Sequence, residues 1–139
     1  MGRVLSIDYG RKRVGIAITD PLKIIASGLE TVHSKDIFTF LTRYLNTENV
    51  ECFVVGYPLQ MNGKPSESIE FIDPFIKKLK KTFPDIPVKL IDERFTSKIA
   101  FQTMIDGGLK KKKRQDKALI DKISATIILQ SYLEQKKLI

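Results

Sequence analysis

The stretch VLSIDYGRKRVGIAIT, residues 4–19, holds two apolar runs separated by a short polar turn. Runs of this kind on either side of YGRK predict two β-strands joined tightly, with Gly10 supplying the turn. The first run ends on a carboxylate, Asp8, and the glycine is followed by three basic residues, Arg11, Lys12 and Arg13. An acid at a strand end beside a basic turn is a candidate functional position.

The remaining apolar patterns alternate between strands and helices. We expect five strands, over residues 3–9, 13–19, 24–32, 52–58 and 88–92. Helices are expected over residues 36–45, 66–83, 97–106 and 116–135.

Three details of the helices can be predicted as well. Ser34 is expected to cap the first helix, and Pro74 to kink or split the second. The last helix is expected to turn toward the core a set of five apolar residues, namely Leu119, Ile120, Ile123, Ile127 and Leu133.

The order of elements predicts the fold class. The first three strands should form an antiparallel meander, and each later strand, reached through a helix, should run parallel to the first. We therefore expect an α/β fold with a mixed five-stranded sheet flanked by helices, forming one domain over residues 1–139. Ligand sites in such sheets gather at the carboxyl ends of the parallel strands.

Composition limits the class of protein. The one cysteine, Cys52, permits no internal disulfide, and no apolar run is long enough to suggest a signal peptide or a membrane span. We therefore expect a cytoplasmic protein without membrane partners, with Cys52 in the core and His33 at the surface or in a cap.

The net charge of +8 is concentrated near the carboxyl terminus. The last quarter of the chain carries a basic run: Lys110, Lys111, Lys112, Lys113 and Arg114. Such asymmetry indicates a polyanionic partner; a solvated lysine-rich loop is the alternative.

Three acidic positions are expected at one sheet edge. Asp8 ends the first strand, Asp92 and Glu93 end the last strand, and Asp121 lies early in the last helix. Clustered carboxylates repel one another unless a cation is present, and hard oxygen ligands favour Mg²⁺ or Mn²⁺. Taken singly, each acid also has a structural explanation: a turn former, a cap, or an ion pair between Asp121 and Lys117.

Four motifs in this order resemble the YqgF family, also called RuvX: SIDYGRKRVGIAIT, VVGYPLQMNG, LIDERFTS and LIDKISATIILQSYL. The resemblance covers nearly the whole chain. It implies a ribonuclease H-like fold and a metal-dependent nuclease that matures the 5′ end of the 16S ribosomal RNA precursor, with ribosomal particles as partners.

The resemblance also implies the site residues. The catalytic and metal-binding acids are Asp8, Glu93 and Asp121. Glu93 is favoured over Asp92 because successive strand residues face opposite sides. Gly10, Lys12, Arg13 and the basic run 110–114 are expected to hold substrate phosphates. One or two Mg²⁺ ions would activate a water, and the second ion or a basic side chain would stabilise the departing oxygen.

Three other interpretations stay open. A Holliday-junction resolvase would cut branched DNA, normally as a homodimer. A nuclease that acts on precursor ribosomal RNA is expected as a monomer or a homodimer. The DYGRKRVG segment, residues 8–15, also resembles the phosphate loop of sugar kinases and actin-like ATPases, which use two such domains. A nucleic-acid-binding assembly factor without turnover is the third possibility.

Overall fold

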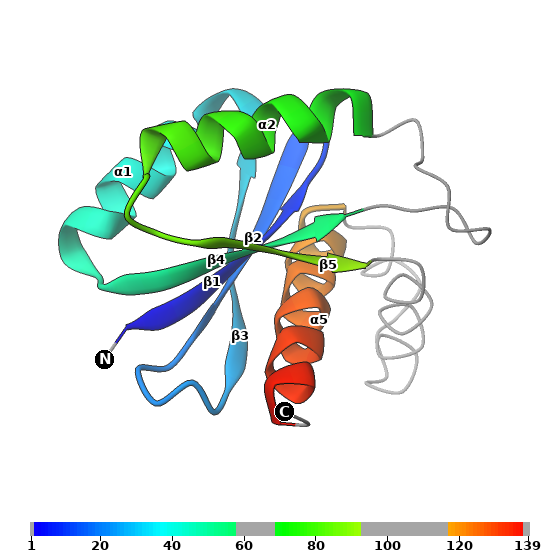
Figure 1. Cartoon of the computed structure of the whole chain (residues 1–139). Coiled ribbons are helices and arrows are strands. Elements are labelled where there is room, and N and C mark those ends of the chain that lie inside the picture. Colours follow the sequence, from blue (N-terminus) through cyan, green and yellow to red (C-terminus); the bar gives the residue numbers. More distant parts are fainter. Residues whose placement is uncertain (1, 58–68, 93–116, 138–139) are drawn as a thin grey trace.

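The computed structural model describes residues 2–57, 69–92 and 117–137, and these form a sheet with helices on both faces (Figure 1). The sheet has five strands in the order β3-β2-β1-β4-β5. The strands are β1 (Arg3–Tyr9), β2 (Arg13–Thr19), β3 (Ala26–His33), β4 (Val50–Tyr57) and β5 (Val88–Asp92).

Strand pairing confirms the predicted mixed sheet. The first three strands form an antiparallel meander, with Leu5 opposite Ile18 and Ile16 opposite Glu30. Strand β4 runs parallel to β1 on the other side, and β5 runs parallel to β4. The carboxyl ends of β1, β4 and β5 therefore lie along the same edge.

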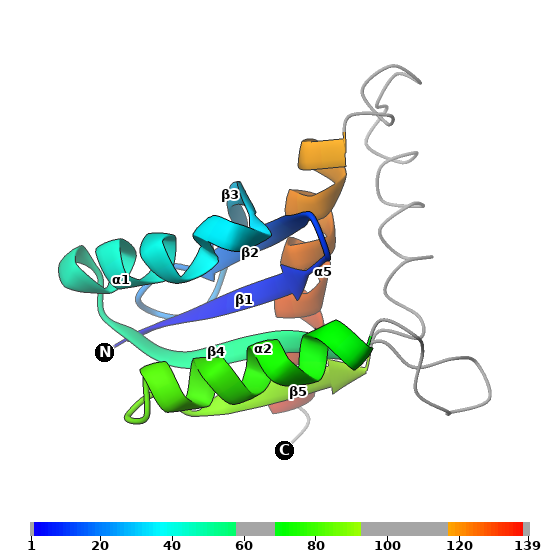
Figure 2. The ribbon, with the colours of Figure 1, turned by 90° about the horizontal axis from the view of Figure 1, so that it is seen from above.

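Two helices cover one face of the sheet, which we call the two-helix face. They are α1 (Ile37–Thr47), preceded by the short 3₁₀ helix η1 (Ser34–Asp36), and α2 (Ile69–Thr82). Seen from above, α2 lies over β4 and β5 (Figure 2). The larger buried cluster, which includes Leu5, Phe53 and Leu79, fills this layer.

A single described helix, α5 (Lys117–Lys137), lies against the opposite face, which we call the α5 face (Figure 1). It packs on β1, β2 and β3. The smaller buried cluster fills this layer: Val4, Ala17, Cys52, Val54, Ile91, Ala125, Ile128 and Leu129. Cys52 is thus a core residue, as expected.

The side of α5 that meets the sheet differs from the predicted one. Ile127 is buried, but Leu119, Ile120, Ile123 and Leu133 are only partly buried. The sheet is met by Ala125, Ile128, Leu129 and Tyr132 instead. The apolar residues of α5 are spread over several of its sides, so their spacing alone did not single out one face.

Three local predictions need correction. Ser34 does not cap α1; its N-cap is Asp36, which makes no capping hydrogen bond through its side chain. Of the two outcomes expected at Pro74, a kink or a split, the split does not occur, because α2 runs from Ile69 to Thr82 with Pro74 inside it. Strand β3 begins at Ala26, and the preceding Ile24 and Ile25 are exposed.

Several expectations fall outside the described residues. These are the helix over residues 97–106, Glu93, and the basic run Lys110, Lys111, Lys112, Lys113 and Arg114. His33 is exposed, and its Nδ1 accepts a hydrogen bond from the Lys35 amide at 3.0 Å. That is the surface or capping role predicted for it.

Candidate nuclease site

The turn between β1 and β2 is closed by backbone contacts that only glycine permits. The Gly10 amide donates to the Arg13 carbonyl at 3.0 Å, and a Cβ at Gly10 would lie 2.6 Å from that oxygen. Ser34 holds the turn from outside, since its amide donates to Lys12 O at 3.0 Å and its hydroxyl to Arg11 O at 2.7 Å. We call this turn, residues 10–13, the basic turn, and it is fixed to the start of η1.

Strand alternation places Asp8 on the α5 face. Ser6, two residues earlier, faces the same way, because its buried hydroxyl donates to the Ala125 carbonyl of α5 at 2.6 Å. Ala125 lies one helical turn after Asp121. Asp8 and Asp121 thus occupy the next positions along the same strand–helix contact.

Gly15 brings the two acids together. It pairs with Asp8 across the β1–β2 ladder, where opposite Cα atoms are about 5 Å apart. On the α5 face it lies against Asp121, since a Cβ at Gly15 would stand 2.5 Å from the Asp121 carbonyl carbon and 3.1 Å from its Cβ. Asp8 and Asp121 therefore lie on one patch of this face, which we call the acidic patch.

Arg13 forms an ion pair with Asp121. Its Nε lies 2.9 Å from Asp121 Oδ2, with side-chain exposures of 39% and 21% respectively. The predicted alternative partner was Lys117, and Asp121 pairs with Arg13 instead. Arg13 thus lies within the acidic patch, where its charge offsets that of the carboxylates.

The end of β5 separates Asp92 from this patch. Asp92 pairs with Tyr57, and both lie on the two-helix face, where the Tyr57 hydroxyl donates to Asp73 at 2.9 Å. That hydrogen bond raises the pKa of Tyr57. Asp92 is exposed and points away from Asp8, which leaves Glu93, outside the described residues, as the expected acid of this strand.

The two described acids fit a divalent cation that prefers oxygen ligands. Both are carboxylates, they come from β1 and α5, and a guanidinium already compensates one of them. Within residues 2–57, 69–92 and 117–137, no group of three or more His, Cys, Asp or Glu side chains is placed to hold a metal ion. The other ligands of such a cation would be water, substrate phosphate or residues outside these ranges.

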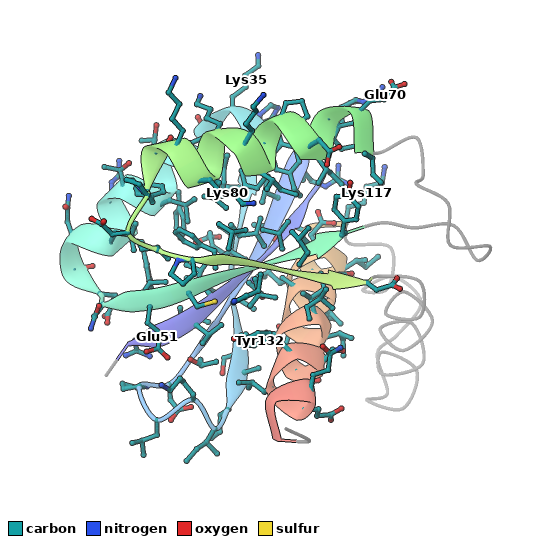
Figure 3. All side chains as sticks on the ribbon, viewed as in Figure 1. Lys35, Glu51, Glu70, Lys80, Lys117 and Tyr132 are labelled. Atoms are coloured by element: carbon teal, nitrogen blue, oxygen red, sulfur yellow. The ribbon has the colours of Figure 1, made fainter. Side chains whose placement is uncertain are left out.

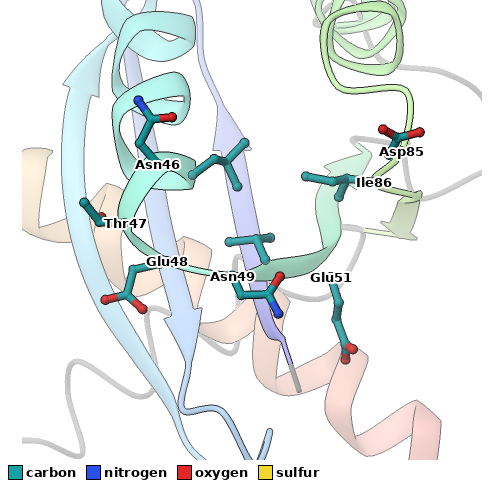
Figure 4. Close-up of a pocket in the computed structure, with 9 residues that line it drawn as sticks. Asn46, Thr47, Glu48, Asn49, Glu51, Asp85 and Ile86 are labelled. Carbon is teal, nitrogen blue, oxygen red and sulfur yellow. The ribbon is translucent and has the colours of Figure 1, made fainter.

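A pocket of about 690 Å³ opens at the opposite end of the sheet (Figure 4). Its acidic side chains are Glu48, Glu51 and Asp85, and two of these are paired, Glu48 with Arg3 at 3.1 Å and Glu51 with Lys23 at 2.6 Å. Negative lining at the amino ends of the parallel strands disfavours phosphate. This pocket is not a candidate for the site.

Two residues that build the site were missed from the sequence. Ser6 reads as one more residue of an apolar strand, so nothing in its spacing indicated a bond to a helix more than 100 positions away. Gly15 carried a usable signal, because a glycine inside a strand often marks close approach of another backbone.

Comparison with known proteins is consistent with this architecture. The family model for RuvX, described as a Holliday junction resolvase, matches residues 2–135. A Phocaeicola vulgatus protein named "Putative pre-16S rRNA nuclease" is 58% identical over 139 residues, covering 100% of both chains. A Flavobacterium psychrophilum protein with the same name is 59% identical over 136 residues, covering 98% of this chain and 99% of that one.

Solved structures share the fold at low identity. The Fowlpox virus resolvase, crystallised with Holliday junction DNA, gives a TM-score of 0.58 at 18% identity, covering 96% of this chain and 97% of that one. RuvC from T. thermophilus, in complex with a Holliday junction substrate, gives 0.57 at 15% identity, covering 98% and 97%. The sheet is therefore of the ribonuclease H-like type expected.

No described helix is long and apolar enough to cross a membrane. The match to the family model over residues 2–135, together with relatives more than half identical over the full length, establishes that this chain belongs to the RuvX (YqgF) family of nucleases.

Proposed function

We propose that the chain is a metal-dependent nuclease that cleaves phosphodiester bonds during 5′-end maturation of precursor 16S ribosomal RNA. The observation that carries the proposal is the placement of Asp8 and Asp121 on one patch beside Gly15. The name of the full-length relatives supports the substrate. Residues 1–139 would act as one nuclease domain, in the cytoplasm, where ribosomal precursors are found.

In this proposal Asp8, Asp121 and Glu93 would hold the metal. The register of the sheet supports Glu93 as the third ligand. Gly56 follows the Ile7–Val55 pair and itself pairs with Ile91, so the end of β5 lies at the same edge of the sheet as Asp8. Alternation from Asp92 would point the next residue toward the α5 face. Two strand spacings, about 10 Å, separate β1 from β5. Asp8 and Glu93 would therefore reach the metal from opposite sides.

When bound, Mg²⁺ or Mn²⁺ would help to activate a water for attack and would neutralise charge on the phosphate. The chain's own groups then orient the substrate. Lys12 is exposed at the tip of the basic turn and Arg13 lies beside Asp121, so both cations are near a phosphate that reaches the acids. Gly10 keeps the turn compact. The basic run 110–114 would hold more distant phosphates.

The test is cleavage of an RNA carrying the 16S 5′ leader, with and without Mg²⁺. Asp8→Asn and Asp121→Asn are each expected to lower the rate about 100-fold or more, since metal assistance is worth several kcal/mol. Asp85→Asn, an exposed acid at the other end of the sheet, serves as the control and should keep full activity. Full Mg²⁺-dependent cleavage by Asp8→Asn would contradict the proposal.

Branched DNA is the second candidate substrate, favoured by the description of the family model as a Holliday junction resolvase. A resolvase that cuts both strands symmetrically needs two copies of the site. Symmetric cleavage of a four-way junction by a dimer, with no cleavage of the leader RNA, would select this function. A monomer that cuts only the RNA would exclude it.

A further inference from the structure

A second pocket, of about 440 Å³, opens on the two-helix face, behind the candidate site. Its walls come from the end of β1, from η1, and from facing sides of α1 and α2. Six of its lining residues combine aromatic rings and positive charge: Tyr9, Lys35, Phe38, Phe71, Phe75 and Lys78. None of the described residues that line it is acidic.

The aromatic rings form a continuous group. Tyr9 stacks on Phe75 with ring centroids 4.1 Å apart and planes 12° apart, and Phe38 and Phe71 flank this pair at 5.6 Å from Phe75 and 6.1 Å from Tyr9. Phe75 is buried at 4% exposure, whereas Phe38, Phe71 and Tyr9 keep part of their surface exposed. Exposed ring surface in a pocket is suited to stacking with a planar ligand.

Cations surround the same rings. The Lys78 ammonium lies 4.6 Å from the Phe38 ring centroid, and the Arg11 guanidinium lies 5.1 Å from that of Phe71. Lys35 also lines the pocket, and its side chain is exposed and extends away from the sheet (Figure 3). Asp73, the acid next to Pro74 on α2, accepts the Tyr57 hydroxyl. Rings for stacking together with cations at the rim are the features that bind unpaired nucleotides.

The pocket is connected to the candidate site by the basic turn. Tyr9 follows Asp8 directly, so Tyr9 faces the pocket while Asp8 faces the opposite side of the sheet, toward Asp121. Ser34 lines the pocket and also holds the turn through Arg11 O and Lys12 O. A nucleic-acid strand at Asp8 can therefore pass over Arg11 and Lys12 and enter the pocket.

We propose that this aromatic–basic pocket binds an unpaired nucleotide of the RNA substrate, a few nucleotides from the cleaved bond, with the base on Phe38 and Phe71 and the phosphate at Lys35 and Lys78. The proposal rests on the nuclease function proposed above. It gives the enzyme a preference for RNA that is single-stranded beside the cleavage point.

The test is equilibrium binding of a fluorescent single-stranded RNA in EDTA, measured by anisotropy on an Asp8→Asn background, with a duplex of the same sequence for comparison. Phe71→Leu, which keeps apolar volume but removes the ring, should weaken single-strand binding about tenfold and leave duplex binding unchanged. Lys35→Ser with Lys78→Ser should weaken single-strand binding more than Lys77→Ser with Lys81→Ser, which removes the same charge outside the pocket.

Equal losses in the two lysine pairs, or unchanged binding by Phe71→Leu, would overturn the proposal. A second measurement needs no variant: RNA carrying 5-iodouridine should cross-link on irradiation to Phe38, Phe71 or Tyr9, and cross-links confined to other segments would also overturn it. If the wild-type protein cleaves no RNA while the pocket variants still lose single-strand binding, the nuclease function fails and the pocket stands as an RNA-binding site.

Discussion

Replacing Gly15 with alanine tests whether the contact between β2 and α5 builds the candidate site. The new methyl group would lie 2.5 Å from the carbonyl carbon of Asp121 and 3.1 Å from its Cβ. Both atoms belong to a helix whose next turn is held by the Ser6–Ala125 hydrogen bond. The helix must therefore retreat by about 1 Å, because a carbon contact is comfortable only near 3.5–4.0 Å.

The cost follows from that displacement. Overpacking in a close-packed layer costs about 1–3 kcal/mol, and stretching the buried Ser6–Ala125 bond adds about 1 kcal/mol. A total near 3 kcal/mol lowers Tm by about 10 °C for a domain of this size. Since the displaced residue is Asp121, the cleavage rate should fall even at temperatures well below Tm, where the variant is still folded.

Gly28 provides the matched control. It lies on β3 under the same helix, but a Cβ there would meet Lys122 Cβ and Thr126 Oγ1 at an ordinary 3.4 Å. Gly28→Ala should leave Tm unchanged or slightly raised, since alanine restricts the unfolded chain. The measurements are thermal unfolding by circular dichroism and cleavage rate at 20 °C below Tm. Equal Tm values for the two variants would refute the close approach of α5 to β2.

Three further changes give independent outcomes. Arg13→Gln removes the cation beside Asp121, so the Mg²⁺ concentration for half-maximal cleavage should fall about two- to fivefold; an unchanged Mg²⁺ titration would refute this electrostatic role. Ser6→Ala should lower the free energy of unfolding by about 1 kcal/mol in urea titration, and no change would mean that the bond to Ala125 contributes nothing. Burial, as the larger cause, and the nearby Cys52, as the smaller, raise the pKa of Tyr132 to about 12. The contribution of Tyr132 to the free energy of unfolding is therefore fully present below pH 10 and is lost between pH 10 and 12. Tyr132→Phe should lessen the fall in urea midpoint between pH 9 and pH 11.

The sheet could be predicted from the sequence because its strands are encoded locally. Each run is bounded by turn residues, and the order of strands and helices leaves few allowed connections. The ends were less certain: β3 starts two residues later than expected because Asp20 organises the preceding loop, accepting the amides of Ile24 and Ile25 at 2.8 and 2.7 Å. Such a loop can be recognised only once its backbone contacts are known.

The candidate site could be predicted only in part. Asp8 and Asp121 were recognisable because strand ends and a terminal helix are expected to converge at one edge of the sheet. Their actual proximity depends on Gly15, and the orientation of α5 depends on Ser6, Ala125 and Tyr132. These are tertiary contacts between segments far apart in the sequence, and a helix whose apolar residues are spread over several sides gives no pattern that selects them.

The position of Arg13 joins the basic turn to the acidic patch. Its backbone carbonyl closes the turn with Gly10, while its guanidinium reaches Asp121 on the α5 face. Arg11, two residues earlier, points to the other face and covers Phe71. Alternate cations of one short turn therefore serve opposite faces of the sheet. A substrate strand that crosses this turn would meet positive charge continuously, with carboxylates on one side and aromatic rings on the other. The turn of residues 10–13 would therefore fix the distance along the substrate between the cleaved bond and the stacked base.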